Sequence, residues 1–176
     1  MSQSDFSPLE ICPDCGLKAP LSPVGTHRYL GASSGCWNLY SNMLNGGSPP
    51  LPPGPLNVLL VDAYASQHHG LPGPQAIQSV AVHLLTMYGI FERGHTVDQA
   101  LWLRRRFLRD GPIPKHDRFE WLTPPADLSR RTILEIINAP TPAERGPIVE
   151  AYVNAVYDAW HGAHGSKLRE WYERYM

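Results

Sequence analysis

The segment Ile77-Gln-Ser-Val-Ala-Val-His-Leu-Leu-Thr-Met-Tyr88 decides the fold class. Its apolar residues recur at intervals of three and four, which is the spacing of one face of an α-helix. These residues are Ile77, Val80, Ala81, Leu84, Leu85 and Tyr88. The pattern predicts an amphipathic helix with one face turned to a core.

The segments on either side of this helix are also predicted to be helical. Leu56 to His68 is almost entirely apolar and predicts a buried helix, although the β-branched content of Val58 to Val61 leaves a strand as the competitor. Gly70 to Pro74 forms a short turn between this segment and the next helix. Downstream, Thr96-Val-Asp-Gln99 resembles a capping box and opens a helix that runs to Leu108.

Three further helices are expected outside this central region. Short helices are predicted at Cys36 to Asn45 and at Arg131 to Asn138. Thr141-Pro142-Ala143-Glu144 combines an N-cap, a first-turn proline and a box glutamate, and it opens the last helix. Gly165 is expected to break that helix near its end. The fold class is therefore mainly α, with a loop-rich N-terminal arm packed on a bundle of five to seven helices.

The chain of 176 residues suits a single domain over residues 1–176. Residues 1–35 hold cysteines, prolines and glycines without sustained periodicity, so we expect an irregular arm that a metal would stabilise. Residues 46–55 contain five prolines and predict an extended connector. Residues 56–176 form the predicted helical core, with a proline-rich surface excursion at 112–128.

Composition excludes several classes of protein. The net charge of −1 argues against a dedicated nucleic-acid-binding domain, which usually carries a basic excess. Arg104-Arg105-Arg106 with Arg109 is interpreted as a solvated helix face. No apolar run is long enough to cross a bilayer. The start, Met1 to Asp5, lacks the features of a secretion signal, so a cytoplasmic location is expected.

Cys12-Pro13-Asp14-Cys15-Gly16 is the strongest indication of chemistry in the sequence. Two thiolates with two residues between them can chelate one tetrahedral ion, and proline and glycine suit the turn between them. An odd total of three cysteines does not suit a disulfide framework. A redox pair is the rival interpretation, but such pairs normally begin a helix in a βαβ unit, which is absent here.

Completing a metal site requires ligands from elsewhere in the chain. Cys36 is the predicted third ligand, with a buried core cysteine beside Trp37 as the alternative. A histidine is expected as the fourth, and His68 is preferred. The candidates for this position are His27, His68, His69, His83 and His164.

Asp62, His68, His69 and His83 form a second group of polar residues, placed on two adjacent predicted helices. Asp62 lies within an apolar run, where a carboxylate is destabilising unless it is paired or ligated. The last helix adds His161 and His164, which are neighbours on its surface. Asp62, His83 and His164 are therefore the candidate catalytic residues, with core histidines and a solvent-exposed pair as the plainer alternatives.

Several motifs together resemble a known family. They are Cys-Pro-Asp-Cys-Gly at 12–16, Cys36-Trp37 with Tyr40, Asp62-Ala-Tyr-Ala-Ser-Gln-His68, Gln78-Ser-Val-Ala-Val-His-Leu84, and Ala159-Trp160 with His164 and Trp171. The combination resembles an uncharacterised bacterial family known only as a domain of unknown function. The resemblance covers most of the chain and is weakest over 90–145. It implies a proline after the first histidine of the Gln-His segment, whereas His69 stands there as a second possible ligand.

Three hypotheses follow. The first is a helical zinc protein with a structural site formed by Cys12, Cys15, Cys36 and His68, whose partner is a small molecule or a protein. The second is a metal-dependent hydrolase-like enzyme in which Asp62, His83 and His164 act at an open metal position. The third is a redox-regulated module in which thiolate oxidation releases zinc. No phosphate loop, nucleophile elbow or His-Glu-x-x-His motif is present.

Overall fold

The helices of this chain follow the predicted order along the sequence. The computed structural model describes residues 8–46, 54–109, 118–128 and 131–175. Within these, the elements are β1 (Leu9–Ile11), β2 (Lys18–Pro20), α1 (Ser34–Leu44), α2 (Pro55–Gln67), α3 (Pro74–Arg93), α4 (Val97–Leu108), α5 (Ile133–Ile137) and α6 (Pro142–Tyr175). The prediction of a mainly α fold with a loop-rich N-terminal region on helices is confirmed.

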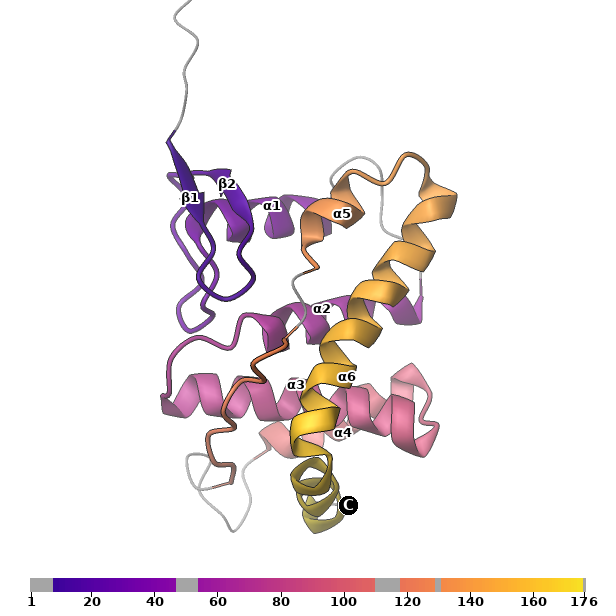
Figure 1. Cartoon of the computed structure of the whole chain (residues 1–176). Helices are drawn as coiled ribbons and strands as arrows, with labels where there is room; N and C mark the ends of the chain where they lie inside the picture. Colours follow the sequence, from indigo (N-terminus) through magenta and orange to yellow (C-terminus); the bar gives the residue numbers. More distant parts are fainter. Residues whose placement is uncertain (1–7, 47–53, 110–117, 129–130, 176) are drawn as a thin grey trace, which may run out of the picture.

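The helical core is built on α2 and α3, which pack against each other and against α6 (Figure 1). The α2 segment is helical throughout, so the alternative of a strand at Val58 to Val61 is wrong. Its C-terminal half is buried from Leu59 to Gln67 almost without interruption, which explains its nearly continuous apolar sequence. The α3 helix buries the predicted stripe from Val80 to Tyr88, with Ile77 half-buried, and continues to Arg93, where Gly94 in the left-handed region ends it.

The remaining predicted helices are also present, with small shifts. The capping box at Thr96 is formed with both of its hydrogen bonds and begins α4. In α6 the break lies at His164, whose φ of −134° and ψ of 16° are non-helical, one residue before the predicted Gly165. Trp160 and Trp171 flank this kink, and both are fully buried in the core.

The N-terminal arm contains a structure that the sequence did not predict. Strands β1 and β2 pair antiparallel, with Glu10 opposite Ala19, and the Cys12 to Gly16 turn lies between them. Each strand has three residues, which is too short to show an alternating pattern. The hairpin and α1 lie side by side at one end of the molecule (Figure 1).

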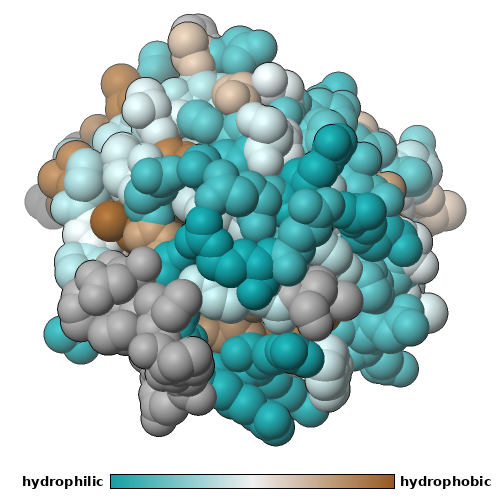
Figure 2. All heavy atoms as spheres, turned by 90° about the horizontal axis from the view of Figure 1, so that it is seen from below, coloured by the Kyte–Doolittle hydropathy of each residue, from teal (hydrophilic) through white to brown (hydrophobic). Residues whose placement is uncertain are grey.

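One hydrophobic cluster joins the arm to the helices. It includes the three cysteines as well as the large aromatic residues of α2, α3 and α6. The face at the C-terminal end of α6 is mainly hydrophilic, with hydrophobic residues in small separate patches (Figure 2). None of the described helices combines the length and apolar character needed to cross a bilayer.

Some predictions concern residues that fall outside the described ranges. Most of the proline-rich connector at 46–55 and the first part of the excursion at 112–128 lie there. The single-domain organisation over residues 1–176 stays a prediction.

Candidate metal centre

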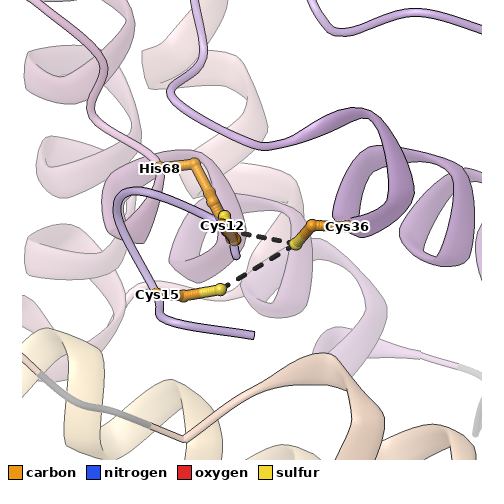
Figure 3. Close-up of side chains that lie close together, drawn as sticks. All are labelled: Cys12, Cys15, Cys36 and His68. Carbon is orange, nitrogen blue, oxygen red and sulfur yellow. Dashed lines mark hydrogen bonds between the residues drawn. The ribbon is translucent and has the colours of Figure 1, made fainter. Parts of the chain in front are cut away.

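Four donor side chains from three parts of the chain converge on one point. Cys12 and Cys15 come from the hairpin turn, Cys36 from α1, and His68 from the end of α2 (Figure 3). Their ligand atoms all lie within 4.8 Å of one another. Each of the four residues is at most 5% exposed. The arrangement is a buried Cys₃His group that could hold a metal ion.

The turn that carries Cys12 and Cys15 is closed by its own backbone. The Gly16 amide donates to the Cys12 carbonyl at 2.9 Å, and the Cys12 amide donates to the Leu17 carbonyl at 2.8 Å. Gly16 has a φ of +74°, in the left-handed region that glycine adopts without strain. These bonds fix the chain so that both sulfurs face the same side of the turn.

Asp14, between the two cysteines, fastens this turn to the end of α2. Its Oδ2 accepts a hydrogen bond from the Gly70 amide at 2.9 Å. The Asp14 carboxylate fills the space where a side chain at Gly31 would stand. The Gly31 amide in turn donates to the His68 carbonyl at 3.2 Å. The hairpin turn, the loop at Gly31 and the end of α2 are thus held together around the cysteines.

Cys36 lies in the first turn of α1, where side chains cap the helix. The Ser33 hydroxyl accepts from the Cys36 amide at 3.3 Å. Glu10 of β1 accepts from the Gly35 amide and from the Ser34 hydroxyl, both at 2.5 Å. The hairpin that carries two of the cysteines therefore also fixes the helix turn that carries the third.

His68 is oriented as a metal ligand would be. Its Nδ1 lies 2.9 Å from the Tyr64 carbonyl, which can only accept, so Nδ1 carries the hydrogen. Its Nε2 lies 3.4 Å from the Cys36 sulfur and faces the group. Metal-binding histidines commonly donate their other ring N–H to a backbone carbonyl in this way.

The donor separations match the edges of a coordination tetrahedron. Zinc bonds of about 2.3 Å to sulfur and about 2.0 Å to nitrogen give tetrahedral edges of roughly 3.8 Å between sulfurs and roughly 3.5 Å between sulfur and nitrogen. The Cys15 and Cys36 sulfurs are 3.9 Å apart, and Cys36 Sγ is 3.4 Å from His68 Nε2. The geometry fits one tetrahedral ion.

Contacts within the group shift the pKa values of its members when no metal is bound. Hydrogen bonds from the Cys15 and Cys36 thiols lower the pKa of Cys12, whereas hydrogen bonding to Cys12 and Cys15, together with burial, raises the pKa of Cys36. Burial lowers the pKa of His68, but its contacts with Cys12 and Cys15 outweigh burial and raise it to about 9. Metal binding requires that protons on the thiols and on His68 Nε2 be released.

Tyr64 adds a hydroxyl beside the group. Its Oη lies 3.5 Å from the Cys36 sulfur, and burial raises the pKa of Tyr64, so the neutral hydroxyl can donate to a thiolate. The Tyr64 ring stacks on Tyr40 with 3.6 Å between centroids and 3° between planes. This hydroxyl is therefore rigidly held next to one of the donors.

The other predicted fourth ligands lie elsewhere. His27 is in ring contact with Tyr29 and Trp37, and His69 contacts the Gly70 carbonyl and lies 3.8 Å from Asp14. His164 Nε2 lies 2.8 Å from the Thr123 carbonyl. Neither these three histidines nor His83 belongs to the Cys₃His group.

The candidate catalytic residues are only partly brought together. Asp62 Oδ1 lies 2.6 Å from His83 Nδ1, so these two form a pair between α2 and α3. His164, with its partner Thr123, is not part of that pair. Arg104 of α4 also donates to Asp62 Oδ1 and supplies the partner that a buried carboxylate requires.

Sequence reasoning missed four residues that shape these sites. Asp14 and Glu10 act through backbone amides of distant segments, which no local pattern reveals. The helical spacing of Tyr64 and His68 indicates that they share a face, but it does not reveal the contact of the Tyr64 hydroxyl with the Cys36 sulfur. The sequence predicts a solvated run that includes Arg104, yet its 19% exposed side chain pairs with Asp62.

Comparison with known protein families matches residues 10–161 to a family of unknown function, DUF5946. The chain belongs to DUF5946. The match begins two residues before Cys12 and includes Cys15, Cys36 and His68. The predicted membership of a family of unknown function is thereby confirmed. Comparisons with curated proteins and with solved structures gave no match.

Proposed function

We propose that this member of DUF5946 is a zinc protein in which Cys12, Cys15, Cys36 and His68 hold one structural Zn²⁺. The observation that carries the proposal is the buried group of four donor atoms within 4.8 Å, with His68 Nε2 directed into it by the bond from Nδ1 to the Tyr64 carbonyl. Hydrogen-bonded thiols alone would not require this orientation of the histidine.

The donor set favours zinc over other metals. Thiolate and imidazole ligands in a tetrahedron are typical of Zn²⁺, whereas calcium and magnesium take oxygen ligands. Three thiolates with one dication leave a net charge of −1 in a buried place. The Tyr64 hydroxyl and the carbonyl-bound imidazole are suited to stabilise that charge.

Four protein ligands favour a structural role over a catalytic one. A catalytic zinc keeps one position for water or substrate, and a complete Cys₃His set leaves none. The ion would join the hairpin, α1 and α2, which are separate in sequence. Structural zinc in small folded units contributes about 10–16 kcal/mol of apparent binding energy, comparable to the whole net stability of a domain. The arm therefore depends on the metal for its order.

The proposed site also bears on where the protein works. Thiolate ligands need a reducing compartment, which supports the cytoplasm. With the metal serving structure, the biological activity would lie in binding a small molecule or a protein. The Asp62 and His83 pair lies apart from the Cys₃His group and is available for that second role.

Metal analysis tests this proposal most directly. The protein is purified without a histidine tag as wild type, Cys12→Ser, His68→Ala and His69→Ala, and metal is measured by mass spectrometry. His69→Ala is the matched control, because this adjacent histidine contacts Asp14 and lies outside the group. We expect about one zinc per chain in the wild type and in His69→Ala, and a large loss in the other two variants.

Replacement of zinc by Co²⁺ gives an independent measure of the donor set. Cobalt in a tetrahedral thiolate site shows visible bands and a sulfur charge-transfer band, and we expect both. A folded wild-type protein that contains no metal and binds no cobalt would overturn the proposal. Equal zinc in His68→Ala and the wild type would remove His68 from the ligand set and reopen the choice of fourth donor.

A further inference from the structure

We propose that Arg104 and His83, held side by side by Asp62, bind a small molecule through its carboxylate or phosphate group in a cavity between α3 and α4. This site is separate from the Cys₃His group and does not depend on the metal. Three observations carry the proposal: the shared anchor, the unused donor positions, and the chemistry of the cavity wall.

Asp62 anchors both side chains through one oxygen atom. His83 Nδ1 lies 2.6 Å from Asp62 Oδ1, and the Arg104 guanidinium donates to the same atom. The second oxygen, Oδ2, is buried and has no hydrogen-bond partner among the described residues. In the most stable arginine–carboxylate pairs both carboxylate oxygens accept from the guanidinium in a bidentate contact. Here the carboxylate instead fixes two side chains next to each other.

Each anchored side chain keeps a polar position that the fold does not use. Arg104 donates from Nη2 to Asp62 and from Nε to the Thr86 hydroxyl at 3.3 Å. Its Nη1 has no hydrogen bond among the described residues. His83 Nδ1 contacts Asp62, and His83 Nε2 likewise has no hydrogen-bond partner in the described part of the chain. Two fixed side chains whose remaining polar positions contact no described residue and are open to a ligand form a pre-organised binding site.

Both groups line the same cavity of about 370 Å³. Its other polar lining residues are uncharged, and they are Tyr29, Gln75, Gln78 and Ser79. Among the described residues no carboxylate belongs to the lining, and the charges there are those of Arg104 and, when protonated, His83. The volume lies at the lower end of the range for small-molecule sites. This wall favours a small anion whose charged end contacts the cation and whose remainder contacts amides and hydroxyls.

The cavity on the other side of Arg104 has different chemistry. Its volume is about 570 Å³, and apolar side chains such as Met43, Val58, Val61 and Leu101 dominate its wall. An ion would lose its hydration there without replacement by hydrogen bonds. The polar cavity that His83 shares is therefore the place for the anionic group.

Binding is tested on the full-length, metal-loaded protein by calorimetry with inorganic phosphate and, separately, with acetate, at constant ionic strength set with chloride. Nitrogen-15 NMR follows His83 Nε2 during the same titrations. We expect saturable binding of one anion per chain and a shift of the Nε2 signal. Which of the two probes binds more tightly identifies the phosphate or the carboxylate class.

Variants separate the site from general charge attraction. Arg104→Lys keeps the positive charge opposite Asp62 but loses the planar guanidinium with its several donors. Arg105→Lys makes the same change at an exposed neighbour and is the matched control. Loss of a charge-assisted hydrogen bond should weaken binding about tenfold or more in Arg104→Lys and in His83→Gln, and leave Arg105→Lys unchanged. If a variant fails to fold, the wild-type NMR titration still decides. No saturable binding of either probe to the wild type, or equal weakening in Arg105→Lys, would overturn the proposal.

Discussion

At the scale of single residues, the hydroxyl of Tyr64 tests the idea that groups around the cysteines tune the metal. Tyr64→Phe removes the donor beside the Cys36 sulfur and keeps the ring that stacks on Tyr40. Loss of such outer contacts typically weakens metal binding about 10- to 100-fold. We expect a drop of about tenfold in zinc affinity, measured by competition with a chromophoric chelator.

Tyr40→Phe is the control for this change, because it removes a hydroxyl from the partner ring in the same stack. The Tyr40 hydroxyl has no hydrogen bond among the described residues, so zinc affinity should stay at the wild-type value. Equal affinity for Tyr64→Phe and the wild type would show that the contact at 3.5 Å does not stabilise a thiolate.

Individual residues also show what the sequence could indicate about the site. The spacing of Cys12 and Cys15 predicts a chelating turn, and Cys36 and His68 are the predicted third and fourth donors. The structure brings these four together, and their role as ligands stays a prediction. Spacing could not reveal that Arg104 reaches Asp62 across 42 positions, because that contact depends on how α4 packs on α3.

At the scale of elements, replacing a glycine by alanine should have opposite effects on stability in α1 and in α6. The reason is that β2 packs closely on α1 at Gly35. A Cβ at Gly35 in α1 would clash with the Pro20 carbonyl and lie 2.9 Å from the Ala19 side chain. Gly35→Ala should therefore destabilise the protein by about 1–3 kcal/mol and weaken zinc binding through the displaced Cys36. Chemical denaturation and zinc competition measure the two effects.

Gly162→Ala in α6 is the matched substitution. A Cβ there meets no atom within 4 Å, so the change should stabilise the helix by about 0.5–1 kcal/mol. Destabilisation by Gly162→Ala, or a neutral Gly35→Ala, would contradict the packing described for that helix.

The elements also separate what a pattern can predict from what it cannot. The helices α2, α3 and α4 followed from apolar spacing and a capping box, since these signals are local. The hairpin gives no such signal, because its three-residue strands are held by contacts with distant segments. One such contact joins Glu10 of β1 to the start of α1. The predicted break in α6 at Gly165 lies one residue from the observed break at His164.

At the scale of the whole molecule, the arm and the helical core differ in what holds them. The core helices α2, α3, α4 and α6 pack on one another through a large apolar cluster. The arm contributes its cysteines and a few further side chains to that cluster, and polar contacts, chiefly Asp14 to Gly70 and Gly31 to His68, attach it further. Removal of zinc should therefore affect the two parts unequally.

Chelation followed by hydrogen exchange measures this difference. After zinc is removed, amides of β1, β2 and the first turn of α1 should lose protection, because three buried thiols and an imidazole no longer share a cation. Amides of α3 and of α6 before its kink should stay protected, and circular dichroism should keep most of its helical signal. His69→Ala with zinc bound is the control and should resemble the wild type.

Unchanged protection of the β1 and β2 amides after complete zinc removal would show that Asp14, Glu10 and apolar packing suffice to hold the arm. Global loss of protection would instead show that arm and core unfold as one cooperative unit.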